Sequence, residues 1–304
     1  MSLLVTGSIG IDTVKTPHGV SENCVGGSAV YFSMAASFFS PVRFVGVVGP
    51  DCPFDLAKVF AGRPIDLRGL EVRKGSKTFR WQGSYHGQMN EAKTEGVELN
   101  VLAEQPPKVP KEFADSEFVF LANTHPALQQ KLLEQIGGPK FVVADTMNLW
   151  IENEFDEIQK LLKKVDGLII NDGEARLLAR HHNTIIAAEH ILDMGPKVVV
   201  IKKGEYGSML MDRDGNIFML PAYPTTNVKD PTGAGDSFAG AFMGYLANVK
   251  TTDIASLKNA IAYGTVVASF TIEDFSLQGL ADTTTSDIEK RFMLLRELTT
   301  FGKP

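Results

Sequence analysis

Short runs of apolar, often β-branched residues alternate with helical patterns along most of this 304-residue chain. Runs of this length and composition are typical of strands buried inside a sheet. The predicted strands are residues 3–9, 42–48, 118–121, 141–144, 168–170 and 198–201, and the helices predicted to alternate with them are residues 28–39, 127–136, 155–165, 185–194 and 237–246. This alternation predicts an α/β fold in which helices cover both faces of a mostly parallel sheet.

Polar segments follow directly on these predicted strands. They are residues 7–12, 49–51, 123–125, 145–148, 171–174 and 202–204. In an open parallel sheet the ligand binds in the crevice outside the carboxyl ends of the strands. The sequence therefore predicts that the reactive groups lie together at one edge of the sheet.

Two stretches break the alternation, residues 13–25 and residues 71–102. Both mix strand-like polar and apolar residues with turn residues, and the second contains the aromatic-rich segment 77–85. We expect them to form a small separate β-sheet, while residues 1–12, 26–70 and 103–304 form the α/β core. The alternative is that residues 77–85 form an ordinary surface hairpin with exposed aromatic side chains.

The most informative motif is Asp-Pro-Thr-Gly-Ala-Gly-Asp at residues 230–236, which runs directly into an apolar helix. Gly233, Ala234 and Gly235 are small enough for backbone N–H groups to close on an anion at the helix N-terminus, where the helix dipole favours negative charge. Asp236, placed beside that anion, can take the proton from an attacking hydroxyl while the N–H groups bind a phosphoryl group. The alternative is that Asp236 only caps the helix and the glycines only make the turn.

This motif resembles the C-terminal signature of the PfkB/ribokinase family of carbohydrate and nucleoside kinases. Two N-terminal segments, Gly-Ser-Ile-Gly-Ile-Asp at residues 7–12 and Gly-Gly-Ser-Ala at residues 26–29, resemble the substrate-binding elements of the same family. The resemblance spans nearly the whole chain. It implies a ribokinase-like three-layer α/β/α sandwich with a small β-sheet lid over the sugar, and phosphoryl transfer from ATP with Asp236 as general base.

The resemblance also implies a Mg²⁺ site. Asn171 and Glu174 match the family's Asn-x-x-Glu motif, which organises Mg²⁺ and its waters near the nucleotide phosphates. Asn at an N-cap with Glu at N3 is equally the pattern of a helix capping box. We expect both roles to hold together.

Several residues are expected to contact ATP on the same grounds, namely Lys202, Gly204, Gly207, Thr232 and Asn259. A plain hairpin turn explains Gly204 and Gly207 as well, and either Lys202 or Lys203 can face the nucleotide. Residues 270–276 replace a Gly-containing segment that helps to hold a monovalent cation in ribokinase, so dependence on K⁺ is left open.

The acceptor is expected to be a sugar or a related polyol. Asp12 can accept hydrogen bonds from two vicinal hydroxyls, and Gly26 and Gly27 match the paired glycines of the family. Tyr31 stands where ribokinase-like proteins commonly carry Asn, so the resemblance does not assign ribose itself.

Arg80 and Trp81 of the expected lid offer an acceptor charge-assisted hydrogen bonds and a flat apolar face. Other cations lie near them in the sequence, namely Arg73, Lys74 and Lys93. Together they predict an anionic acceptor, either a sugar acid or a sugar phosphate. The alternative is that these cations are solvated or pair with the glutamates at positions 91 and 95.

Composition and missing motifs disfavour several other classes. A net charge of -6 argues against general binding of nucleic acid, which needs a concentrated basic face. The sequence contains no Walker A motif, which disfavours a P-loop ATPase, and no Gly-x-Gly-x-x-Gly after the first strand, which disfavours a dinucleotide-dependent oxidoreductase. Cys24 and Cys52 are too few and too far apart for a disulfide framework, so we expect reduced thiols in a cytoplasmic protein. No apolar run approaches the roughly 20 residues that a membrane span needs.

We therefore expect an ATP-dependent kinase that phosphorylates a hydroxyl of a sugar or sugar-like acceptor. The expected binding partners are ATP and this small-molecule acceptor. The resemblance also implies that two copies of the chain form a homodimer through the lid. One alternative is a nucleoside kinase. The other is a non-catalytic sugar-binding protein, which would keep Asp12, Gly26 and Gly27 but would not need Asp236.

Overall fold

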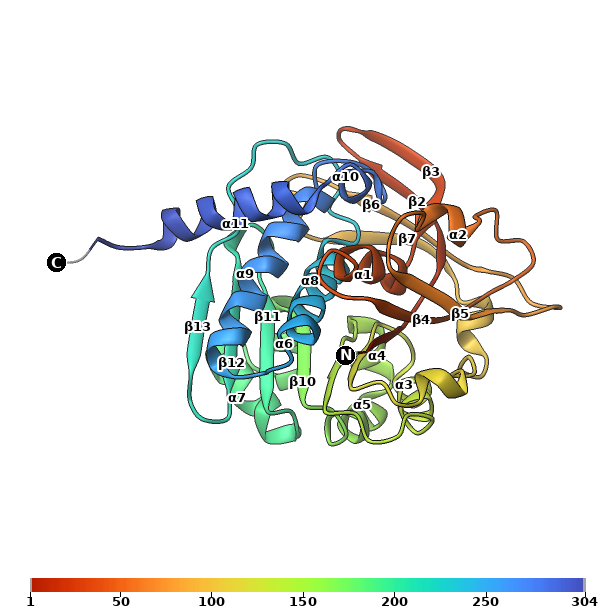
Figure 1. The fold of residues 1–304 in the computed structure, drawn as a ribbon, viewed down its shortest axis with the longest axis horizontal. Helices are drawn as coiled ribbons and strands as arrows, with labels where there is room; N and C mark the ends of the chain where they lie inside the picture. The colour runs from red at the N-terminus through yellow and green to blue at the C-terminus, as the bar shows by residue number, and fades with distance from the viewer. Residues whose placement is uncertain (1, 303–304) are drawn as a thin grey trace.

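A nine-stranded sheet covered by helices forms most of the computed structural model, which describes residues 2–302 (Figure 1). In chain order its strands are β1 (Leu3–Thr6), β4 (Val42–Val48), β5 (Ile65–Val72), β8 (Phe118–Leu121), β9 (Phe141–Ala144), β10 (Gly167–Asn171), β11 (Val198–Lys202), β12 (Ser208–Asp212) and β13 (Ile217–Leu220). In space they lie in the order β13-β12-β11-β10-β9-β8-β1-β4-β5. Strands β11 to β5 run parallel, and β12 and β13 are added antiparallel at one edge.

Helices pack on both faces of this sheet (Figure 1). One face carries α1 (Ser28–Ala36), α2 (Leu56–Val59), α8 (Ala234–Val249), α9 (Ile254–Thr271), α10 (Gln278–Ala281) and α11 (Thr285–Thr299). The other carries α3 (Pro126–Leu133), α4 (Asn148–Asn153), α5 (Phe155–Leu162), α6 (Asp172–Ala179) and α7 (Thr184–Met194). Short 3₁₀ turns are η1 (Asn100–Ala103), η2 (Lys111–Phe113) and η3 (Gly204–Tyr206). Among residues 2–302, no helix combines the length and the apolar character that crossing a membrane requires.

The central strands are apolar on both sides, because successive residues of a strand point to opposite faces of the sheet. In β1, Leu3 and Val5 pack in the cluster that contains Phe242 of α8, whereas Leu4 packs in the cluster that contains Leu161 of α5. This explains why these strands appear in the sequence as continuous apolar runs. The prediction of a three-layer α/β/α sandwich is confirmed.

A second sheet of four strands lies beside the carboxyl edge of the large sheet (Figure 1). Its strands are β2 (Gly10–Thr16), β3 (Gly19–Gly26), β6 (Phe79–Tyr85) and β7 (Ala92–Glu98), in the order β3-β2-β6-β7. Strands β2 and β6 pair in parallel, and the two outer pairs are antiparallel. The boundaries differ from the expected 13–25 and 71–102 because β2 begins at Gly10, and because residues 71–72 continue the pairing of β5 with β4.

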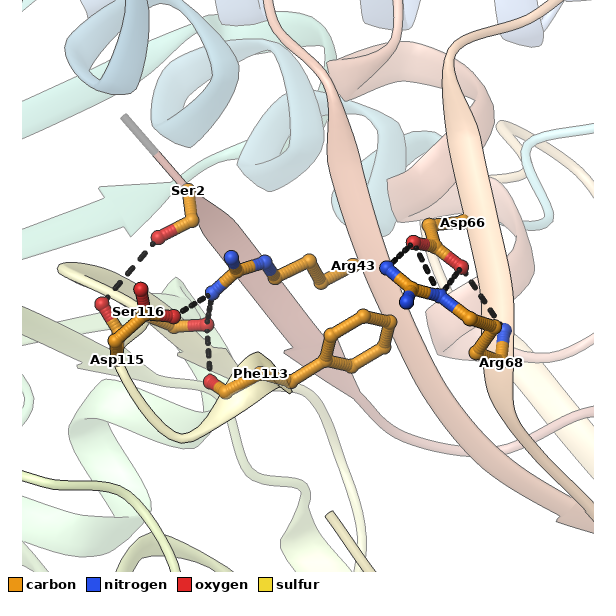
Figure 2. A network of polar contacts seen from close by, with 7 residues as sticks. All are labelled: Ser2, Arg43, Asp66, Arg68, Phe113, Asp115 and Ser116. Carbon is orange, nitrogen blue, oxygen red and sulfur yellow. Dashed lines mark hydrogen bonds and ion pairs between the residues drawn. The ribbon is translucent and has the colours of Figure 1, made fainter. Parts of the chain in front are cut away.

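A network of polar contacts joins the strands at the amino end of the large sheet, opposite the crevice (Figure 2). Arg43 Nη1 donates to Asp115 Oδ1 at 2.5 Å and to Ser116 Oγ at 3.0 Å. On the neighbouring strand β5, Arg68 Nη2 lies 2.6 Å from Asp66 Oδ2. The guanidinium groups of Arg43 and Arg68 both lie against the ring of Phe113. These contacts tie β4 and β5 to the loop before β8, so each cation here already has an acidic partner.

Candidate active site

The polar segments predicted to follow the strands lie at the carboxyl ends of those strands. Asp145 comes directly after β9, Asn171 ends β10, and Lys202 ends β11. The N-terminus of α8 packs beside them, since Gly235 in its first turn lies against the side chain of Lys202. The expected gathering of reactive groups at one edge of the sheet is therefore observed for these residues.

The first turn of α8 has the geometry of an anion site. Gly233, its N-cap, has a φ of 76°, and a Cβ at this position would lie 2.4 Å from the ring of Tyr31, so only glycine fits. Asp230 Oδ1 accepts the N–H of Thr232 at 2.9 Å and fixes the turn before it. Within residues 2–302, the N–H groups of Gly235 and Asp236 have no hydrogen-bond acceptor. They are free to bind an anion at the positive end of the helix dipole.

Asp236 belongs to a cluster of charged side chains that come from separate elements. Lys202 Nζ lies 3.7 Å from Asp145 Oδ2. The charges of Asp145 and Glu174 affect the pKa of Lys202, and the charge of Asp145 also affects the pKa of Asp236. A Cβ on Gly235 would lie 2.7 Å from Lys202 Nζ, so the ammonium group touches the backbone of the anion site. The sequence indicated Asp145 only as a position at the end of a strand, and its pairing with Lys202 is new.

Burial and mutual repulsion change the acidity of these groups. Burial, followed by the charge of Asp145, raises the pKa of Asp236 to about 7, although Lys202 acts in the opposite direction. Burial and Asp145 likewise raise the pKa of Glu174 to about 7. Burial alone would lower the pKa of Lys202, but the neighbouring carboxylates outweigh it and raise that pKa. Asp236 is thus a base whose pKa lies close to neutral pH, as a general base requires.

Asp12 lies in β2 of the small sheet, apart from the cluster around Lys202. Its side chain is 4% exposed, and its Oδ1 has no hydrogen-bond partner among the described residues. A Cβ on Gly26 would lie 1.8 Å from Asp12 Oδ2, so this glycine leaves the space that the carboxylate fills. Gly27, the N-cap of α1, has a φ of 101° and lies against the carbonyl of Ser8. Burial, together with the charges of Asp236 and Asp230, raises the pKa of Asp12 to about 7.

The strand register of the small sheet separates Arg80 from Trp81. Trp81 pairs directly with Asp12 in the parallel ladder, so both side chains lie on the same face of this sheet. Trp81 Nε1 is 3.3 Å from Thr94 Oγ1, and the indole lies over Gly83. Arg80 pairs with Ile11 on the opposite face, and its Nη2 is 3.8 Å from Asp51 Oδ2. The structure therefore brings Trp81, but not Arg80, to the side of Asp12.

Two of the other cations predicted to attract an anionic acceptor, Arg73 and Lys93, have acidic neighbours. Arg73 is paired with Glu71 and with Glu104, each at 2.9 Å. Lys93 Nζ is 3.2 Å from Glu95 Oε1. The pair of Lys93 with Glu95 agrees with the alternative in which these cations pair with glutamates 91 and 95, and Arg73 is paired with two other glutamates.

The loop after β11 owes its glycines to backbone geometry. Gly204 has a φ of 53° and Gly207 a φ of 90°, and a Cβ on Gly207 would lie 2.0 Å from the carbonyl of Leu220. Asn90, between β6 and β7, donates to Glu205 Oε1 at 2.8 Å, which connects the small sheet to this loop. Lys202 points to Asp145 and Gly235, whereas Lys203 contributes its backbone N–H to Gly207.

The remaining predicted nucleotide residues lie on α9 and next to α8. Asn259 is exposed on α9. Thr232 Oγ1 is 3.4 Å from the hydroxyl of Tyr85, a buried residue at the end of β6. The small sheet thus also contacts the turn that leads into the anion site.

Asn171 and Glu174 form the capping box that the sequence predicted as one of their two roles. Asn171 Oδ1 accepts the N–H of Glu174, and Glu174 Oε2 accepts the N–H of Asn171, both at 2.8 Å. Within residues 2–302 no group of three or more His, Cys, Asp or Glu side chains is arranged to hold a metal ion. The capping role is confirmed, and the metal role stays a prediction.

Comparisons with known proteins agree with this arrangement. The family model for pfkB family carbohydrate kinase matches residues 22–284. The chain is similar to the cytidine kinase of Thermococcus kodakarensis, with 29% identity over 252 residues that cover 80% of this chain and 87% of that one.

Solved structures share the fold across almost the whole length. The nucleoside kinase of Burkholderia thailandensis in complex with inosine has a TM-score of 0.78 at 18% identity, covering 96% of each chain. A ribokinase-type structure from E. coli in complex with ATP and Mg²⁺ has a TM-score of 0.76 at 17% identity, covering 96% of this chain and 99% of that one. The family match spans most of the chain, including Gly26, Gly27 and the turn before Asp236. The chain therefore belongs to the PfkB family of carbohydrate kinases and is a phosphotransferase with an alcohol group as acceptor.

Proposed function

We propose that this protein transfers the γ-phosphoryl group of ATP to a hydroxyl of a nucleoside held beside Asp12. The observation that carries the proposal is the first turn of α8, where Asp236 stands next to N–H groups without acceptors and to the ammonium of Lys202. A base beside an anion site is the arrangement that phosphoryl transfer to a hydroxyl needs.

In the proposed step, the Asp236 carboxylate takes the proton of the acceptor hydroxyl. The acceptor oxygen forms a bond to the γ-phosphorus, and the bond between that phosphorus and the oxygen bridging to the β-phosphate breaks. The electron pair of the broken bond leaves with ADP. The N–H groups of Gly235 and Asp236 stabilise the charge on the transferring group, because they are fixed before the reaction begins.

The residues at the end of β10 fit Mg²⁺. Mg²⁺ in kinases is usually held by one or two carboxylates, several waters and the substrate phosphates, where it neutralises phosphate charge. The capping box uses Oε2 of Glu174, so Oε1 is available to a metal-bound water. Burial, followed by the charges of Asp145 and Asp236, raises the pKa of Glu174, and a cation bound beside this carboxylate would favour its ionised form.

Glu174→Gln is expected to raise the Mg²⁺ concentration needed for half-maximal activity several-fold, with a smaller effect on the melting temperature. The amide can still accept a hydrogen bond in the capping box but carries no charge for the metal. The measurement is a Mg²⁺ titration of the rate at saturating ATP. Asp287→Asn, in the equivalent capping box of α11, is the control. An unchanged titration would leave Glu174 with the capping role alone.

A nucleoside is the proposed acceptor because one face of the small sheet offers both a carboxylate and an aromatic ring. Asp12 and Trp81 are neighbours on one face of the small sheet, so a ribose could bind the carboxylate while an attached base rests on the indole. The similar cytidine kinase and the inosine complex of a nucleoside kinase support this choice. We propose that the small sheet acts as the lid over this acceptor; the homodimer through it stays a prediction.

The proposal is tested by measuring ADP release with ATP and Mg²⁺ in the presence of single acceptors. Cytidine, uridine, adenosine, inosine, free pentoses, free hexoses, a sugar acid and a sugar phosphate form the panel. We expect a nucleoside to have the highest kcat/KM. If a free sugar, sugar acid or sugar phosphate exceeded every nucleoside, the nucleoside assignment would be wrong while the kinase assignment would stand.

Trp81→Ala is expected to raise the KM for the best nucleoside roughly 10-fold, because stacking of a base on an aromatic side chain contributes about 1–3 kcal/mol. Its neighbour Arg80, on the opposite face, is the matched control, and Arg80→Ala should change that KM little. The measurement is the KM of each variant at low and high ionic strength. The reverse pattern, with Arg80→Ala raising a salt-dependent KM, would favour the anionic acceptor that the basic residues predict.

A further inference from the structure

We propose that Lys202 binds the transferring phosphoryl group directly, and that Asp145 is a positioning residue that holds the Lys202 ammonium against the first turn of α8. The inference rests on the proposed function and assigns the cation of the same reaction. Asp145 is 5% exposed directly after β9, and the proposed proton transfer to Asp236 does not use its carboxylate.

The position of the ammonium is fixed by its neighbours. Lys202 Nζ would lie 2.7 Å from a Cβ on Gly235, in the same turn whose N–H groups lack acceptors. An anion bound to those N–H groups is therefore next to the ammonium. The 3.7 Å separation between Lys202 Nζ and Asp145 Oδ2 is longer than a hydrogen bond, so the N–H donors of Lys202 remain available to phosphate oxygens.

Asp145 is itself held rigidly. Its Oδ1 accepts the N–H of Thr146 at 2.8 Å, and its backbone carbonyl accepts Gln129 Nε2 at 3.0 Å. The same Gln129 amide also donates to the carbonyls of Leu121 and Ala122 at the end of β8. The carboxylate is thus anchored to two adjacent strands of the sheet, and the flexible Lys202 side chain takes its position from a fixed partner.

Charge balance explains why the site needs this lysine. Asp145, Glu174 and Asp236 surround the place of transfer with negative charge, and Lys202 is the cation whose field lowers the pKa of all three. A phosphoryl group entering beside these carboxylates would be repelled without it. Asp145 therefore acts through Lys202, and its own contribution should disappear when the ammonium is removed.

A double-mutant cycle on kcat tests this dependence. Lys202→Met is expected to lower kcat by about 10²-fold or more, which is the usual cost of removing one group that stabilises the transition state. Asp145→Asn is expected to lower kcat roughly 10-fold in the wild-type background but less than about 2-fold in the Lys202→Met background. Lys203→Met, which removes the adjacent lysine, is the matched control and should keep kcat near the wild-type value.

Binding supplies a readout that does not depend on turnover. By calorimetry, Lys202→Met should weaken the binding of a non-hydrolysable ATP analogue at least several-fold more than the binding of ADP, because only the analogue has a γ-phosphate. Asp145→Asn should likewise weaken the binding of the analogue more than the binding of ADP. If Asp145→Asn does not fold, Asp145→Glu keeps the charge and displaces the carboxylate by one methylene, with the same loss of kcat expected.

Additive losses in the cycle, or an unchanged ratio of analogue to ADP affinity in Lys202→Met, would overturn the inference. Wild-type kcat in the folded Asp145 variants would also overturn it, by leaving the pair a purely structural role. Failure of the proposed function gives a different result, because the wild-type protein would then release no ADP with any acceptor.

Discussion

Asp236→Asn is expected to lower turnover by roughly 10²–10⁴-fold, because the variant keeps the shape of the side chain but loses the general base. The fold should be preserved, since Asn serves at a helix N-terminus as well as Asp does. Acceptor and ATP affinities should change little. The measurement is kcat and both KM values with the best acceptor of the panel.

Asp287→Asn is the matched control, because Asp287 occupies the same third position of its helix as Asp236 does in α8. It should leave kcat unchanged. A normal kcat in Asp236→Asn would show that another group removes the proton.

The kcat/KM of the wild-type protein should rise with pH through about 7 and then level off. The reason is that the pKa values of Asp236 and Asp12 are both raised to about 7, and both groups are needed in the ionised form.

Gly26→Ala raises the KM for the acceptor by about 10–100-fold or more, which corresponds to losing hydrogen bonds to a charged group. The new Cβ would lie 1.8 Å from Asp12 Oδ2, and Asp12, with 4% of its surface exposed, has little space into which it can move. The carboxylate must leave the position in which it meets the acceptor hydroxyls. The KM for ATP should stay close to the wild-type value, because Gly26 is in β3 and not in the turns near α8.

Gly96→Ala in β7 of the same sheet is the matched control, since its Cβ would find its nearest neighbour at 3.5 Å, an ordinary contact. This variant should bind the acceptor as the wild type does. Equal acceptor KM values for the two variants would show that Asp12 does not contact the acceptor.

The central strands and the α8 motif could be predicted from the sequence because their information is local. Strands β8 and β9 match the predicted residues 118–121 and 141–144, since a strand buried on both faces is a continuous apolar run. Strand β5 was not predicted: it lies at the edge of the sheet and carries charged residues such as Asp66 and Arg68. Helix α9 was also missed because it is buried between α8 and α11 and has no clean apolar stripe, although Asp253 caps its start.

The geometry of the site depends on contacts between segments that are far apart in the chain. The sequence alone does not show the spatial order or the register of these segments. That Asp145 meets Lys202 follows from the arrangement of β9 and β11 on either side of β10. That Trp81 shares a face with Asp12, and Arg80 does not, follows from the register of β2 with β6. The residue types were indicated by the sequence, but a shift of one residue in that register would exchange the roles of Arg80 and Trp81.

The transfer itself can be followed with ATP labelled at the γ-phosphorus and the best acceptor of the panel. With the wild-type protein we expect the label to appear on the acceptor in an amount equal to the ADP formed, and with Asp236→Asn we expect it to appear far more slowly. Label found only in inorganic phosphate, or ADP release that does not depend on the acceptor, would contradict the proposed transfer.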